Sequence, residues 1–302
     1  MKKIIICATF FIPALMISCQ LNNKQATTEV IRVTDSVALI TDSLRFSEAT
    51  CWNGESMYIS NFGSKELNPL NKEGKGYILE FKNGQTKVLI PADGKLNAPK
   101  GMCVTNNHLF IADVGAIIVY NLADITKSQK ITFPKDESYV NDIAVSGNTI
   151  YVSVTNTGNI YKLDVTSPDK ISSRPVLFAK VPGANGLAIA DSVMYVASYP
   201  VDGNTAAANV IYTIKNFKAP IVSKLFNRMG QYDGLALSDD HKTLYFTTWV
   251  NGGVGSVTLS DTAVQMIPMP IKLSGPADLT YHNGKLYIPD LPNSRVLIHK
   301  TK

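Results

Sequence analysis

One position in a recurring sequence pattern carries side chains of the kind that bind metal ions. The chain contains "ANGLAI" from Ala184 and "YDGLAL" from Tyr232, each followed by a polar turn and an aromatic-bearing strand. Asn185 and Asp233 occupy the same place in these copies, and Glu48 occupies it in "SEATCW". Two carboxylates and an amide oxygen suit a hard divalent cation such as Ca²⁺, Mg²⁺ or Mn²⁺.

A structural alternative exists for two of these three residues. Asn and Asp before a glycine are common turn residues, so either one alone would indicate only a strand entry. A glutamate has no such turn preference, which makes Glu48 the most informative of the three. Their shared place in a repeat favours a functional role over a structural one.

The pattern occurs six times, at intervals of 41 to 52 residues. The copies read "SEATCW" from Ser47, "PKGMCV" from Pro99, "VNDIAV" from Val140, "ANGLAI" from Ala184, "YDGLAL" from Tyr232 and "PADLTY" from Pro276. Each copy continues into an aromatic-bearing second strand and a third strand, and five show a fourth. Repeats of this length without helical periodicity are typical of a β-propeller. We therefore predict an all-β fold, a six-bladed β-propeller with four-stranded blades.

The last copy lacks a fourth strand before the sequence ends at Lys302. The stretch "EVIRVTD", Glu29 to Asp35, alternates apolar and polar residues. We expect it to supply the missing outer strand, because closing the ring removes unpaired sheet edges. Residues 29–302 are thus predicted to form one propeller.

The innermost strand of each blade starts beside the central channel, so the residue before it should project into the channel mouth. Six blades would bring six such residues together around one axis. We call this set the ring: Glu48, Lys100, Asn141, Asn185, Asp233 and Ala277. Long second-to-third-strand connections at Ser64 to Gly76 and Tyr199 to Asn209 should rim the same face and could select the ligand.

Four of these motifs resemble the senescence-marker-protein, gluconolactonase and regucalcin family. They are "SEAT", "VNDIAV", "ANGLAI" and "YDGLAL", and the turn "SDDHKTLYFTT" is also similar to that family's fifth blade. The resemblance implies a six-bladed propeller with one divalent cation, held by Glu48, Asn185 and Asp233. It also implies that Asn141 contacts water or substrate at the cation, that Asp233 acts as general base, and that the substrates are sugar lactones.

This chemistry is also coherent on physical grounds. A cation polarises a lactone carbonyl and lowers the pKa of a bound water, and a carboxylate at its edge can take the attacking water's proton. Ca²⁺ is the first choice, with Mg²⁺, Mn²⁺ or Zn²⁺ as alternatives. We assign catalysis to Asp233 and Asn141, and substrate binding to Lys100, Asn141 and Tyr139.

The sequence departs from the family pattern at several of these positions. Tyr139 replaces an arginine that family lactonases often carry, Ile143 replaces a glycine, and Lys100 brings a cation into the ring. The sixth blade places Ala277 in the ring and its acid, Asp278, one residue later, where it should point away from the channel. The alternative is therefore a non-catalytic NHL-like propeller that binds a sugar or a protein at the cell envelope.

The N-terminus reads as a bacterial lipoprotein signal. Two lysines precede an apolar run that ends in "LMISC", which resembles a lipobox with Cys19 as the lipidated residue. Simple signal cleavage is the alternative. We predict a signal peptide over residues 1–18, a polar tether over 19–28, and an exported protein anchored in the cell envelope, in the periplasm or at the outer membrane.

Composition limits the remaining possibilities. A net charge of +5 without a basic run argues against nucleic-acid binding. We also expect a monomer that takes a small-molecule substrate and meets the membrane only through its lipid anchor. Neither a GxSxG nor a GxxxxGK[ST] motif occurs. Cys51 and Cys103 fall in apolar strand patterns and should be free buried thiols.

Other polar residues are predicted to be structural. Asp113 and Asp290 end their blades' second strands and should brace a turn, as in NHL-type propellers. His108, His241 and His282 fall in hairpin turns and should be solvated, since no two have the spacing of a metal site or triad.

Overall fold

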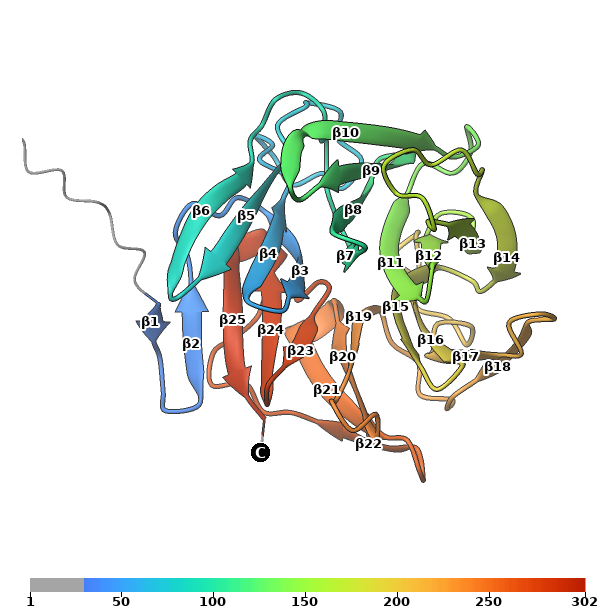
Figure 1. Cartoon of the computed structure of the whole chain (residues 1–302). Helices are drawn as coiled ribbons and strands as arrows, with labels where there is room; N and C mark the ends of the chain where they lie inside the picture. Colours follow the sequence, from blue (N-terminus) through green and yellow to red (C-terminus); the bar gives the residue numbers. More distant parts are fainter. Residues whose placement is uncertain (1–29, 302) are drawn as a thin grey trace, which may run out of the picture.

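The computed structural model describes residues 30–301 and forms six antiparallel sheets around a central axis, which confirms the six-bladed propeller (Figure 1). The predicted signal peptide, the tether and Cys19 lie outside the described residues. Among the residues described, no helix is long and apolar enough to cross a membrane. The only helical elements in this part of the chain are two short 3-10 turns, η1 (Val250–Gly252) and η2 (Leu291–Asn293).

Blades 1 to 5 each contain four strands that follow one another along the chain. Blade 1 comprises β3 (Ser47–Asn53), β4 (Ser56–Asn61), β5 (Tyr77–Lys82) and β6 (Gln85–Ile90). Blade 2 comprises β7 (Met102–Thr105), β8 (His108–Asp113), β9 (Ala116–Asn121) and β10 (Asp124–Thr132). Blade 3 comprises β11 (Val140–Ser146), β12 (Thr149–Val154), β13 (Asn159–Asp164) and β14 (Val176–Lys180). Blade 4 comprises β15 (Ala184–Ala190), β16 (Val193–Ser198), β17 (Tyr212–Lys215) and β18 (Ile221–Lys224). Blade 5 comprises β19 (Tyr232–Leu237), β20 (Thr243–Thr248), β21 (Gly253–Thr258) and β22 (Ala263–Met266).

Blade 6 joins the two ends of the described chain. Its strands are β23 (Thr280–His282), β24 (Lys285–Asp290), β25 (Arg295–Lys300), β2 (Val37–Ile40) and β1 (Ile31–Arg32). An N-terminal strand closes the ring, as predicted, but the strand paired to β25 is β2, with Val37 opposite His299.

The prediction that Glu29 to Asp35 forms the fourth strand is therefore wrong. Within that stretch Ile31 and Arg32 form only a fifth, outermost strand, and Glu29 lies outside the described residues. The physical reason is burial. Val37 and Ile40 are buried against the neighbouring strands, whereas both residues of β1 are exposed, so the short apolar run competes better for the sheet than the alternating stretch does.

The packing between blades explains the recurring apolar residues. Phe110 and Ile117 of blade 2 lie in one buried cluster with Val152 and Tyr161 of blade 3, and equivalent clusters lie between other neighbouring blades. Each sheet therefore buries both faces against its neighbours, which fixes the angle between blades and holds the innermost strands around the axis.

Irregular strand pairing sets the direction of the ring side chains. In blades 1, 3, 4 and 5 the pairing of the innermost strand shifts register across the ring residue and its successor, as between Ser47 and Thr50 or between Tyr232 and Leu235. A β-bulge of this kind bends the strand and redirects its side chains. In blade 3, for example, the two successive residues Asn141 and Asp142 both line axial cavities.

The two predicted bracing aspartates hold the connections that lead into innermost strands. Asp113 accepts hydrogen bonds from the backbone N–H groups of Asn97 and Ala98, at 3.0 and 2.8 Å. Asp290 is fully buried, accepts from the N–H groups of Ser274 and Gly275, and pairs with Arg295 at 2.7 Å. The structural interpretation of both residues is confirmed.

We expect Asp290→Ala to destabilise the protein by about 3–5 kcal/mol, because it leaves the N–H groups of Ser274 and buried Gly275 and a partly buried guanidinium without their acceptor. The measurement is the urea midpoint of unfolding. Asp261→Ala, in an exposed turn of blade 5, is the control and should change stability by less than about 0.5 kcal/mol. Equal stabilities for the two variants would contradict the bracing role.

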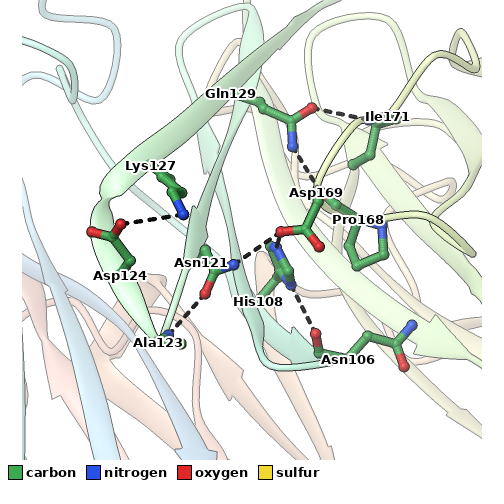
Figure 2. Close-up of polar contacts among 10 residues, drawn as sticks. All are labelled: Asn106, His108, Asn121, Ala123, Asp124, Lys127, Gln129, Pro168, Asp169 and Ile171. Atoms are coloured by element: carbon green, nitrogen blue, oxygen red, sulfur yellow. Dashed lines mark hydrogen bonds and ion pairs between the residues drawn. The ribbon is translucent and has the colours of Figure 1, made fainter.

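The expectation of a solvated His108 is wrong, because the connection between β13 and β14 covers it (Figure 2). Its Nδ1 donates to the Asn106 carbonyl at 2.7 Å, and its Nε2 lies 3.2 Å from Asp169. Gln129 holds the same connection through the Pro168 carbonyl and the Ile171 N–H. These contacts fasten blade 3 to blade 2 far from the axis, which is a structural role.

Candidate functional site

The ring surrounds an axial cavity of about 230 Å³ at the face where the innermost strands begin. Five predicted site residues line it together: Glu48, Tyr139, Asn141, Asn185 and Asp233. Ala277 lines it as well, and all six ring residues are buried. We call this cavity the upper chamber.

The walls of the upper chamber come from residues that the sequence analysis did not single out. Phe62, Tyr199, Trp249 and Leu291 all line it. Each of them directly follows the second strand of its blade, after β4, β16, β20 and β24 respectively. That shared place is a signal that the repeat alignment contained. Leu67 and Pro69 complete the wall from the connection between β4 and β5, one of the two long loops expected there.

Two buried carboxylate oxygens in this chamber lack hydrogen-bond partners. They are Glu48 Oε2 and Asp233 Oδ1. Buried charged oxygens are normally paired, because an unpaired one is costly. Asn141 is held differently, since its Nδ2 donates to Thr155 Oγ1 at 3.0 Å and so fixes the orientation of the amide. Two residues of the chamber thus carry an unsatisfied carboxyl oxygen, and two others carry amides.

Lys100 belongs to the ring in sequence but does not line the upper chamber. Its side chain is fully buried, and its Nζ donates to the Ala98 carbonyl at 2.9 Å. The ammonium lies 5.6 Å from the centroid of the Phe62 ring and 5.3 Å from that of Tyr139. Lys100 can therefore act on the site through its charge, from behind these two aromatic walls.

A second layer of residues narrows the channel below the ring. Asp142 accepts hydrogen bonds from the N–H groups of Ile143 and Leu187, at 2.7 and 2.6 Å. A Cβ added at Gly101 would lie 2.1 Å from Asp142 Oδ1, and one added at Gly234 would lie 2.7 Å from Asp278 Oδ1. Glycine is thus required where a neighbouring blade places an aspartate.

Asp278 is a correction to the sequence analysis. It was expected to point away from the channel, but it lines the cavity at the opposite end together with residues from all six innermost strands. Blade 6 has a bulge as well, since Pro276 bridges Asp290 while Thr280 pairs with Tyr287, and this shift turns the residue after the ring position inward. This lower chamber has a volume of about 350 Å³ and also contains Cys51 and Cys103, which are free thiols as expected.

The channel concentrates buried carboxyl groups, whose charged forms burial disfavours. Burial, followed by the charge of Asp142, raises the pKa of Asp233 to about 7. Burial and then Asp233 raise the pKa of Glu48 well above its usual value, while Lys100 opposes that rise. Burial also lowers the pKa of Lys100 to about 8, against the pull of Asp113 and Glu48. One buried lysine therefore faces several buried carboxylates.

The residues of the upper chamber fit a divalent cation by donor chemistry. Two unpartnered carboxylate oxygens and the amide of Asn185 are hard ligands, and the surrounding negative charge favours a cation. Within residues 30–301, no group of three or more His, Cys, Asp or Glu side chains is arranged to hold a metal ion. The candidate set differs from such groups because it contains two carboxylates and one amide.

The fold and the chamber together define the class of protein, which is a six-bladed propeller with an acidic site on its axis. Comparison with solved structures agrees on the fold. A gluconolactonase from Xanthomonas campestris matches with a TM-score of 0.63 at 16% identity, covering 91% of this chain and 95% of that one. A protein of unknown function from Bacteroides thetaiotaomicron also gives 0.63, at 10% identity, covering 91% and 75% of the two chains.

A lyase has the same overall shape. A catalytically inactive virginiamycin B lyase from Staphylococcus aureus, in a structure with quinupristin, matches with a TM-score of 0.58 at 14% identity, covering 88% of this chain and 99% of that one. No protein-family model and no curated protein matches the chain. At these identities the similarity establishes the fold alone.

Proposed function

We propose that the protein is a metal-dependent hydrolase that opens lactones or related esters in the upper chamber. The observation that carries this proposal is a pair of buried, unpartnered carboxyl oxygens, Glu48 Oε2 and Asp233 Oδ1, on two residues that line one axial cavity. The shared fold with a gluconolactonase and a lyase is compatible with it.

Glu48, Asn185 and Asp233 would hold one divalent cation, with Ca²⁺ as the first choice. When bound, the cation supplies Lewis-acid polarisation of the substrate carbonyl. Asp233 takes the proton of the attacking water as general base. Asn141, oriented by Thr155, donates or accepts a hydrogen bond at the reacting group, and the aromatic walls exclude bulk water from it.

The test is a panel of lactones followed by indicator detection of the released acid, with the protein in excess CaCl₂ or in excess EDTA. We expect hydrolysis in calcium, loss of at least about 100-fold in EDTA, and recovery when calcium is restored. Intact lactones in every condition would refute the enzyme and favour the non-catalytic propeller. Hydrolysis that EDTA does not reduce would refute the requirement for a metal ion.

A further inference from the structure

The upper chamber combines polar groups with one continuous apolar wall. Asn141, Asn185 and Asp233 come from the consecutive blades 3, 4 and 5. Across from them, blade 6 contributes only Ala277 and Leu291, while blade 1 contributes Glu48 together with Phe62 and the loop residue Leu67. Ala277, Leu291 and Phe62 belong to one apolar cluster, against which Trp249 also packs. A bound molecule would therefore meet the carboxyl and amide groups of the ring and, beside them, a hydrocarbon wall formed by Phe62, Ala277 and Leu291.

The mouth of the chamber continues this apolar character. Several large apolar side chains are exposed on the loops that leave this face of the propeller: Leu67, Leu70, Val201, Met229 and Val250. They come from the connections after β4, β16, β18 and β20. Leu67 also lines the chamber, so the exposed apolar groups of this face begin at the cavity itself, as expected of a binding surface.

A polyhydroxylated ligand is poorly matched to this chamber. Each sugar hydroxyl that enters must exchange water for a protein partner, and a hydroxyl left unpaired in an enclosed site is costly. The wall formed by Ala277, Leu291 and Phe62 offers those hydroxyls no side-chain partner. Charged side chains that could pair with them are confined to Glu48 and Asp233 among the residues that line the chamber, and both would be occupied by the cation.

We propose that the site takes lactones or esters with an apolar body, an alkyl-substituted or aryl-substituted ring, in preference to sugar lactones. This inference rests on the proposed function in taking the reacting group to be a lactone. The carbonyl would lie toward Asp233, Asn185 and Asn141, and the apolar substituent would lie on Phe62 and Leu291. A cavity of about 230 Å³ accommodates the ring, and a longer substituent would leave past Leu67.

Binding can be measured without turnover. Trp249 lines the upper chamber, and the only other tryptophan, Trp52, lies in the lower one. In a Trp52→Phe background the fluorescence of Trp249 therefore reports on the upper chamber alone. The probes, in excess CaCl₂, are 6-pentyl-2-piperidinone, a lactam that resists hydrolysis, and gluconolactam.

We expect the alkyl lactam to bind at least about tenfold more tightly than gluconolactam, because the pentyl group is removed from water. Equal affinity, tighter gluconolactam binding, or no saturation by the alkyl lactam would overturn the inference. Leu67→Ser should weaken binding of the alkyl lactam about five- to tenfold and leave the affinity for gluconolactam unchanged. Val88→Ser, an exposed residue on the outer strand β6 of the same blade, should change neither.

Turnover separates this inference from the proposed function. If no lactone is hydrolysed and the alkyl lactam still binds preferentially, the proposed hydrolase fails and the apolar ligand class stands. If gluconolactone is hydrolysed with a higher kcat/KM than an alkyl δ-lactone, the hydrolase stands and the apolar ligand class is overturned.

Discussion

Asp233→Asn is expected to abolish lactone hydrolysis and to weaken calcium binding by on the order of 100-fold or more, since affinity for such a cation depends on the number of charged ligands. The loss in kcat/KM should be about 1,000-fold, because the variant loses both a ligand and the general base. The measurements are calcium calorimetry and hydrolysis of the best lactone on the panel.

The same substitution should stabilise the metal-free protein. Asp233 is buried with an unpartnered Oδ1 among other carboxylates, so removing its charge while keeping its shape relieves an unfavourable burial, by about 1–3 kcal/mol. Asp261→Asn, exposed in the same blade, is the matched control and should alter neither property. An active or calcium-binding Asp233→Asn variant would contradict the assignment of this residue.

Lys100→Met should tighten calcium binding by about tenfold to 100-fold. The ammonium is buried beside Glu48 and repels a cation held there, and a buried charge acts over several ångströms with little screening. The variant also loses the hydrogen bond to the Ala98 carbonyl, which should cost about 1–3 kcal/mol of stability.

Calcium calorimetry and thermal unfolding of the same samples separate these two effects. Lys87→Met removes a largely exposed lysine of blade 1 and controls for the change in net charge, with less than a twofold effect expected on affinity. Unchanged or weaker calcium binding in folded Lys100→Met would show that this lysine does not oppose the cation.

The sequence was sufficient to predict most of the scaffold, because the repeat shows the same strand pattern six times. Equivalence within a closed ring then located Glu48, Asn141, Asn185 and Asp233 around one cavity. The outer edge of blade 6 was harder to predict, because two apolar-containing stretches compete there and burial decides between Val37–Ile40 and Ile31–Arg32.

Side-chain direction was the part that the repeat could not supply. Lys100 has the same backbone place as the other ring residues, but its long side chain folds back to the Ala98 carbonyl. Asp142 and Asp278 enter the channel because bulges break the two-residue alternation of a strand. In four blades the wall residue lies one position past the second strand, but only closure of the ring shows that these residues meet at a ligand-sized cavity.

The central claim is that Glu48, Asn185 and Asp233 hold one divalent cation on the propeller axis. The most direct measurement is an anomalous difference map from crystals of the protein grown or soaked in MnCl₂. We predict one strong peak in the upper chamber, in contact with oxygens of these three side chains. A map without a peak there, at a manganese concentration well above millimolar, or with a peak bound by other residues, would contradict the claim.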